Sequence, residues 1–318
     1  MPLRPTRRSM LLGLAAAPWL PGLARAQGAL EVVATTGMIA DTARVLGGEG
    51  VAVQALMGPG VDPHAYRQTR SAIAAMVGAD LTLWHGLYLE AQMEEFLLDL
   101  GQRKPVAAVA ESVPRDLLLG HDQYPDRFDP HVWMDPTLWS TVSAAIAEAL
   151  AAQRPGLAAD TLALWQEELS ALHAYSQEVL SSIPAESRIL VTAHDAFKYF
   201  GRAYGFEVQG IQGISTESEA GVARIEELVT LLVERNVKAV FVESSVSDRG
   251  LRALVEGAAA QGREVAIGGQ LFSDAMGADG TYEGTYLGMI DHNVTLIARA
   301  LGGAAPDTGR LGHLEAAA

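Results

Sequence analysis

The sequence predicts an α/β protein of two lobes, each with a parallel sheet flanked by helices, bridged by one long rigid helix. First, buried-strand and helical patterns alternate before residue 156 and again after residue 184. Second, one unbroken amphipathic helical pattern covers residues 156–183. Third, 318 residues with 49% hydrophobic content suit two ordinary domains with full cores.

Residues 1–26 have the pattern of an export signal. Arginines precede a short apolar run over residues 10–20, and an alanine on each side of Arg25 marks a cleavage site. The run is too short to span a membrane. We therefore expect a mature chain that begins near Gln27 and is exported to the periplasm, through either the twin-arginine-like pair at residues 7–8 or ordinary Sec secretion.

The net charge and the absence of cysteine limit the classes of ligand and membrane anchor that fit this chain. The signal carries four arginines and no acid, so its removal takes the formal net charge from −15 to −19. Such a charge disfavours nucleic acid and anionic lipid and suits a cationic ligand. Without cysteine the chain has neither disulfides nor the lipidated N-terminal cysteine of a bacterial lipoprotein. We expect a free, monomeric periplasmic protein.

The predicted N-terminal α/β lobe covers residues 27–155. The last predicted helix of this lobe stops before Pro155, because proline cannot continue a helix. The expected strands are 30–36, 51–57, 81–84 and 106–108, and the expected helices are 38–46, 69–77, 86–100 and 137–153, with an irregular loop over 114–128.

The connecting helix is predicted over residues 156–184 and the C-terminal α/β lobe over 185–302, followed by a loose tail, 303–318. Residues 216–219 have the form of a capping box, which assigns their carboxylates to a helix start. The expected strands are 189–193, 208–210, 239–242 and 264–267, and the expected helices are 196–204, 219–235, 249–260 and 289–301.

The tripeptide Asp-Pro-His occurs twice, at residues 62–64 and 129–131. Each proline fixes φ and holds the preceding residue extended, so His64 and His131 stand on stiff loops, a typical setting for a metal ligand. His194 follows a predicted strand at its carboxyl end, where open parallel sheets bind ligands. Asp274 is a fourth candidate, although a helix or turn cap explains it equally well. The other histidines lack a paired motif.

Four segments carry a family resemblance: GPGVDPH at 58–64, FDPHVW at 128–133, TAHDAF at 192–197 and FSDAMG at 272–277. Together they resemble the TroA-like zinc/manganese-binding proteins of bacterial ABC importers. The resemblance runs from about residue 31 to 301, with the motifs in family order, and implies an ion between the lobes bound by His64, His131, His194 and Asp274. It also implies two partners, a membrane permease and its cytoplasmic ATPase.

The chain departs from both branches of that family. Zinc-specialised relatives often carry a histidine-rich loop before the second histidine, whereas residues 114–128 contain only His121. Many manganese-specialised relatives have glutamate where this chain has His194. Three imidazoles and one carboxylate suit tetrahedral Zn²⁺, so Zn²⁺ is favoured and Mn²⁺ remains the other candidate.

Two acidic residues could orient a ligand imidazole. Glu243 ends a predicted strand beside the same crevice, where a salt bridge at the sheet edge explains it equally well. Asp195 follows His194 and could alternatively cap the next helix.

The favoured function is a non-enzymatic periplasmic solute-binding protein for a divalent transition metal. The alternative is an exported zinc-dependent hydrolase, which would keep three protein ligands and use the remaining group as a base. The sequence contains neither His-Glu-x-x-His nor Gly-x-Ser-x-Gly. A cell-surface adhesin fits poorly, because no lipid anchor is encoded.

Overall fold

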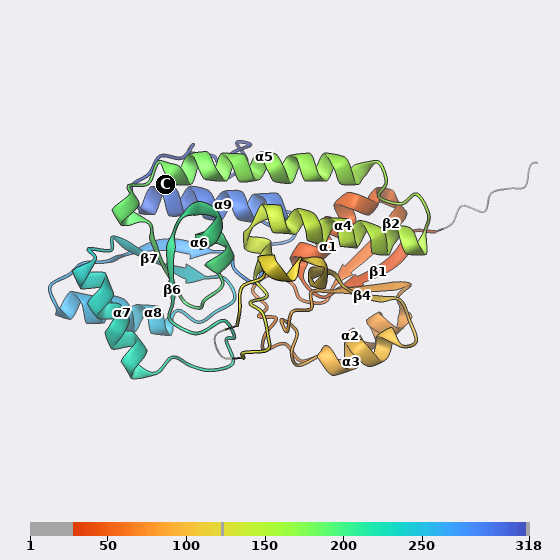
Figure 1. The fold of residues 1–318 in the computed structure, drawn as a ribbon, viewed down its shortest axis with the longest axis horizontal. Helices are drawn as coiled ribbons and strands as arrows, with labels where there is room; N and C mark the ends of the chain where they lie inside the picture. Colours follow the sequence, from red (N-terminus) through yellow and green to blue (C-terminus); the bar gives the residue numbers. More distant parts are fainter. Residues whose placement is uncertain (1–27, 122–123, 316–318) are drawn as a thin grey trace, which may run out of the picture.

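The structure is a computed structural model that describes residues 28–121 and 124–315. The export signal expected over residues 1–26 lies outside this range. The described residues form two α/β lobes joined by the helix α5, Thr161–Ser181 (Figure 1).

Each lobe contains a four-stranded parallel sheet with the same strand order. The N-lobe order is β2-β1-β3-β4 and the C-lobe order is β6-β5-β7-β8. The strands are β1 Leu30–Ala34, β2 Val51–Ala55, β3 Leu81–Trp84, β4 Val106–Ala108, β5 Ile189–Thr192, β6 Glu207–Gly210, β7 Ala239–Glu243 and β8 Ala266–Leu271. The predicted fold class is confirmed.

Helices cover both faces of each sheet. Several start at side chains that cap free backbone N–H groups: Thr69 accepts from Ala72 N at 3.1 Å and Thr285 from Gly288 N at 3.0 Å. The remaining helices are α1 Gly37–Gly47, α2 Arg70–Gly78, α3 Glu94–Gly101, α4 Pro136–Gln153, α6 Lys198–Tyr204, α7 Val222–Glu234, α8 Arg249–Ala260 and α9 Tyr286–Ala300.

The lobes share one apolar core on the side of α5. This core runs from the N-lobe sheet through α1, α4 and α5 to α6 and α9, whereas α2–α3 and α7–α8 cover separate outer cores (Figure 1). At its centre Tyr286 stacks on Trp139 with ring centroids 5.3 Å apart. The lobes are therefore fixed to each other on this side.

Helices α5 and α3 start five or more residues later than the sequence predicts. Residues 155–160 form turns before α5 begins at Thr161, because Gly156 and Ala158 have positive φ angles of 85° and 67°. Likewise α3 begins at Glu94 and not at Gly86, where Gly86 and Tyr88 have φ of 84° and 71°. The spacing of apolar residues, from which the helices were predicted, does not reveal these left-handed backbone angles.

The capping-box prediction for residues 216–219 is wrong. Helix α7 begins at Val222 after Gly221, and Thr216 and Glu217 lie in the loop that precedes it. Both residues contact the other lobe, and their carboxylate and hydroxyl groups are bonded there.

Residues after α9, expected to form a loose tail, pack against the two long helices. Arg310 donates through its backbone N to Asp291 Oδ2 on α9 at 2.8 Å, and its side chain pairs with Glu168 on α5 at 2.9 Å. Leu314 is buried. This segment packs against α5 and α9 as far as Leu314.

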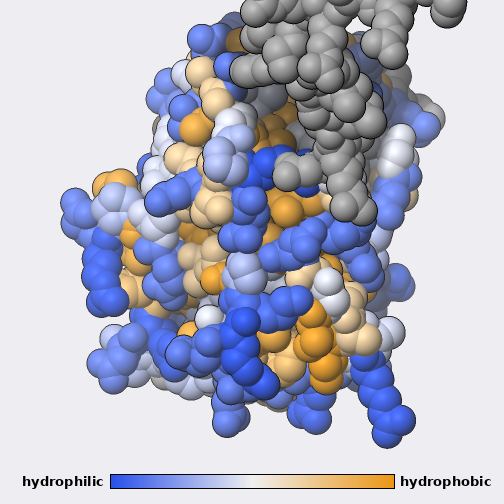
Figure 2. All heavy atoms as spheres, turned by 90° about the vertical axis from the view of Figure 1, so that its right-hand side faces the viewer, coloured by the Kyte–Doolittle hydropathy of each residue, from blue (hydrophilic) through white to orange (hydrophobic). Residues whose placement is uncertain are grey.

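The outer end of the N-lobe is mostly hydrophilic, with apolar side chains scattered between charged ones (Figure 2). Val77 on α2 and Leu98 on α3 are among the exposed apolar residues. Isolated apolar side chains are normal on a protein surface. None of the helices within the described residues has both the length and the apolar character that crossing a membrane requires.

Candidate metal centre

The structure brings the four candidate ligands together between the lobes. His64 lies in the loop after β2, His131 precedes a short 3-10 turn, His194 follows β5 and Asp274 follows β8. One donor atom from each lies within 4.8 Å of all the others. Among the described residues this is the group of histidine and acidic side chains that could hold a metal ion.

The separations match those of donors around one small ion. His64 Nε2 lies 3.3 Å from His131 Nε2, and the Asp274 oxygens lie 3.1 Å from His194 Nε2, 3.4 Å from His131 Nε2 and 3.7 Å from His64 Nε2. Four donors at about 2.0–2.2 Å from a tetrahedral Zn²⁺ would be roughly 3.3–3.6 Å apart.

Burial of the cluster also favours a cation. Asp274 is 2% exposed, and neither of its oxygens has a hydrogen bond of good geometry within the described residues. Leaving a carboxylate buried without a donor is costly, and a divalent ion among the four side chains removes that cost. The donor set, three imidazoles and a carboxylate, fits Zn²⁺.

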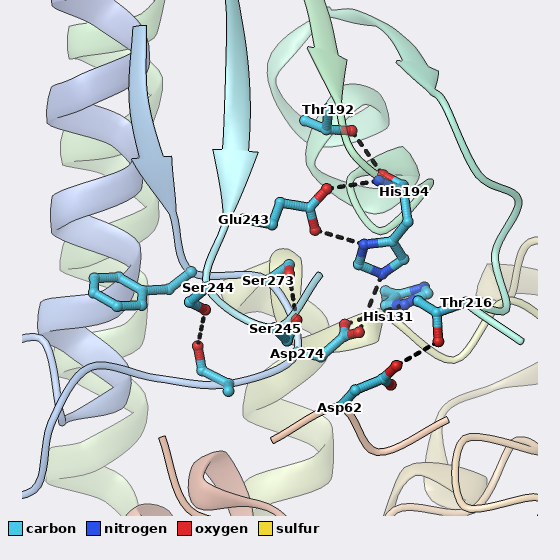
Figure 3. Close-up of polar contacts among 12 residues, drawn as sticks. Asp62, His131, Thr192, His194, Thr216, Glu243, Ser244, Ser245, Ser273 and Asp274 are labelled. Carbon is cyan, nitrogen blue, oxygen red and sulfur yellow. Dashed lines mark hydrogen bonds and ion pairs between the residues drawn. The ribbon is translucent and has the colours of Figure 1, made fainter. Parts of the chain in front are cut away.

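Two of the imidazoles are oriented by a carboxylate on their far nitrogen. His131 Nδ1 lies 2.7 Å from Asp129 Oδ1. His194 Nδ1 lies 2.5 Å from Glu243 Oε2 (Figure 3). Glu243 also accepts from His194 N at 2.7 Å. Such partners fix the tautomer so that Nε2 faces the centre and raise the basicity of the ligand.

The suggested partner Asp195 has a different contact. Its carboxylate pairs with Lys198 in the first turn of α6 at 2.9 Å. The residue adjacent to His194 in sequence therefore contacts the helix start, and Glu243, from the next strand of the sheet, contacts the imidazole.

The backbone of both Asp-Pro-His segments has the same turn. Asp62 Oδ1 accepts from His64 N at 2.8 Å, and Asp129 Oδ1 accepts from His131 N at 3.0 Å. An aspartate that bonds the backbone two residues on forms an Asx turn, and the intervening proline stiffens it. The repeated tripeptide thus presents both histidines in the same local way.

The three ligand histidines have different pKa values because their surroundings differ. Burial lowers the pKa of His64 to about 3, because Asp274 only partly offsets the desolvation and the neighbouring histidines oppose the charge. Burial also opposes the charge on His131, but Asp129 and Asp274 raise its pKa to about 9. Asp274 and Glu243 likewise hold the pKa of His194 above its usual range against the effect of burial.

The carboxylate of Asp274 has the complementary shift. Burial raises its pKa, but His194 and His131 outweigh burial and keep it well below the ordinary value for aspartate. The metal-free cluster at neutral pH therefore combines the ionised carboxylate of Asp274 with the protonated imidazoles of His131 and His194. An ion that binds there must displace the protons of these imidazoles.

Residues that the sequence did not single out support the same loops. His85 Nε2 lies 2.7 Å from Pro130 O, and its ring is edge-on to Trp133. Trp133 Nε1 donates to Ser273 O at 2.8 Å, which joins the loops of His131 and Asp274. The Asx potential of Asp129 was visible in its tripeptide, but the partners of His85 and Trp133 depend on tertiary packing.

Comparison with known proteins gives consistent matches over nearly the whole described chain. Residues 32–300 match the ZnuA family, described as the periplasmic component A of a zinc-uptake complex. The chain is 47% identical over 276 residues to the manganese-binding lipoprotein MntA of Bacillus subtilis, which covers 86% of this chain and 90% of MntA. It is 45% identical over 281 residues to the zinc-binding protein TroA of Treponema pallidum, which covers 87% of this chain and 91% of TroA. The solved structure of TroA superposes with a TM-score of 0.84 over 86% of this chain and 99% of TroA.

Proposed function

The chain belongs to the ZnuA family, and on that premise we propose that it is a solute-binding protein that captures one divalent transition-metal ion between its lobes and delivers it to an ABC-type permease. The observation that carries the proposal is the buried cluster of His64, His131, His194 and Asp274 with donor separations of 3.1–3.7 Å. The partners are the membrane permease and its cytoplasmic ATPase, and the working location is the periplasm.

Zinc is the favoured ion. The two relatives do not decide the choice, because the manganese-binding protein and the zinc-binding protein are 47% and 45% identical to this chain. Three imidazoles and one carboxylate form the closed tetrahedral shell that Zn²⁺ prefers, whereas Mn²⁺ favours more oxygen donors. Both oxygens of Asp274 face the imidazoles, so bidentate binding would provide a fifth donor for Mn²⁺.

The same shell argues against the alternative of a zinc-dependent hydrolase. A catalytic zinc keeps a position open for water or substrate. Here four protein donors fit one ion and all four residues are at most 4% exposed. The family consists of solute-binding proteins, and a closed site suits capture and release of the ion itself.

Native mass spectrometry with metal analysis tests this function on the mature protein purified from its own periplasm. We expect one divalent ion per chain, with zinc predominant, and its loss on treatment with a chelator. Protein made in another host would not identify the physiological ion, because available Zn²⁺ outcompetes Mn²⁺ for nitrogen donors and would fill the site. Protein that carries no transition metal would overturn the proposal, whereas manganese would overturn only the choice of ion.

A further inference from the structure

Release of an ion from this site requires the lobes to separate. The four ligand residues are between 0% and 4% exposed, and each lobe supplies two of them. An ion among them therefore has no direct route to solvent while the lobes are closed. Contacts that hold the lobes together must influence the release rate, an inference that rests on the proposed metal-binding function.

The side of the interface next to α5 is suited to act as the hinge. The chain crosses there in α5, and buried hydrogen bonds join the lobes: Tyr199 Oη donates to Asp129 O and Tyr286 Oη donates to Trp133 O, both at 2.8 Å. The shared apolar core surrounds these bonds. Separation is easiest on the opposite side.

On that opposite side the β6–α7 loop reaches across to the N-lobe (Figure 1). The Thr216 hydroxyl donates to Asp62 Oδ2 at 2.5 Å (Figure 3). Beside it Gln92 Nε2 donates to Glu217 Oε1 at 2.5 Å. We call Thr216 and Glu217 the clasp.

The clasp acts directly on a ligand loop. Asp62 accepts from Thr216 through Oδ2 and from His64 N through Oδ1, so one carboxylate links the C-lobe to the turn that presents His64. Opening the lobes breaks the first bond and frees this turn. The side chain of Asp129 differs, because its Oδ1 accepts from His131 N and lies beside His131 Nδ1 in its own segment.

We propose that the clasp holds the lobes closed over the bound ion and sets its release rate, with Thr216 as a positioning residue that acts on His64 through Asp62. A hydroxyl bonded to a carboxylate is a charge-assisted contact, and its loss corresponds to roughly a 10- to 100-fold change in an equilibrium constant. The Gln92–Glu217 contact is exposed and contributes a smaller factor.

The test measures release from the zinc-loaded full chain by stopped-flow mixing with excess chelator. Thr216→Val removes the hydroxyl but leaves the bond between Asp62 and His64 N intact, and we expect release to become at least about tenfold faster. Thr216→Ser restores the hydroxyl and should release at the wild-type rate. Thr230→Val is the matched control, because its hydroxyl bonds Glu226 O within α7 on the surface of the same lobe.

Gln92→Ala provides a second variant from the opposite lobe and should accelerate release a few-fold. Thr216→Val that releases zinc within twofold of Thr230→Val would overturn the proposal. So would Thr216→Ser that is as fast as Thr216→Val, since the hydroxyl would then not be responsible.

A metal-free measurement separates this proposal from the proposed function. Hydrogen exchange of apo protein should be faster in Thr216→Val than in Thr230→Val at residues 211–221 and 58–64, while the β5 amides stay equally protected. Equal exchange in both segments would overturn the clasp even if zinc binding is established. Wild-type protein that binds no zinc would overturn the proposed function, and the exchange result would still decide whether the clasp holds the lobes together.

Discussion

The two Asp-Pro-His segments have the same tripeptide and the same turn, yet their aspartates have different second partners. In both, Oδ1 accepts the N–H of the histidine two residues on, at 2.8 Å for His64 and 3.0 Å for His131. In the second segment that oxygen also lies 2.7 Å from the ring nitrogen Nδ1 of His131. In the first, the other oxygen accepts from Thr216 of the opposite lobe at 2.5 Å.

This difference gives the two histidines opposite properties. Asp129 helps to raise the pKa of His131 to about 9, whereas burial lowers that of His64 to about 3. His131 is oriented within its own lobe before the ion arrives. The turn of His64 is linked to the C-lobe through the side chain of Asp62, so breaking the contact with Thr216 acts on His64 through its orienting aspartate. A repeated motif therefore establishes a shared backbone but not a shared role.

Removing either histidine should have the largest effect. His64→Ala and His131→Ala each delete an inner donor, and we expect zinc affinity to fall by more than about 100-fold, beyond the 10–100-fold typical of supporting groups. Competition titration of apo protein against a chelator measures this loss. His173→Ala is the control, since His173 lies on α5 and contacts Tyr204 of α6, outside the ligand cluster. Wild-type affinity in His64→Ala would show that the first segment is not a ligand loop.

The aspartates provide the sharpest test of the comparison. Asp129→Asn removes the charge beside Nδ1 of His131 and should weaken zinc binding about 10–100-fold. Asp62→Asn keeps an oxygen that can accept from His64 N, so equilibrium affinity should fall less than about tenfold. Equal losses of affinity in the two variants, measured in the same competition titration, would mean that the two aspartates contribute equally to zinc binding.

The pH dependence of zinc affinity should follow His131 and His194 and not His64. Below pH 9 the metal-free His131 holds a proton that zinc must displace, and His194, whose pKa is also raised, holds a second. Affinity therefore rises by up to about 100-fold per pH unit, and the contribution of His131 levels off near pH 9. His64 is unprotonated above about pH 3 and adds no slope. Isothermal titration in buffers of different ionisation enthalpy counts the protons released. In Asp129→Asn the slope between pH 7 and 9 should shrink, whereas an unchanged slope would contradict the assignment.

Much of the architecture could be predicted from local patterns. The strands β1, β3 and β5 are short and apolar except for one residue each, and the sequence places them within a residue or two. The late start of α5 was missed because positive φ at Ala158 is not encoded by residue type. The sequence pattern does not reveal the packing of the segment at Arg310, because this packing depends on a tertiary contact. The backbone N–H of Arg310 donates to the buried carboxylate of Asp291, 19 residues earlier.

The ligands were predictable and their partners were not, for a physical reason. A histidine on a proline-stiffened loop or at a strand end is recognisable from its neighbours in sequence. Its orienting group is set by rotamers and by the sheet order, which places β7 beside β5 and so brings Glu243 to His194. The misassigned capping box shows the same limit, because Thr216 finds its acceptor 154 residues away.

The smallest expected effect concerns the third aspartate beside a ligand histidine. Asp195 is next to His194 in the chain, yet it pairs with Lys198 at 2.9 Å, and Glu243 occupies the Nδ1 side of the imidazole. Asp195→Asn should therefore change zinc affinity by less than about twofold, while Glu243→Gln costs about 10–100-fold. Both are read in the same competition titration, with thermal unfolding of the apo proteins as a check on folding. If Asp195→Asn weakened binding as much as Glu243→Gln, adjacency in sequence would matter more than contact with the ring, and the distinction drawn between the two Asp-Pro-His segments would lose its basis.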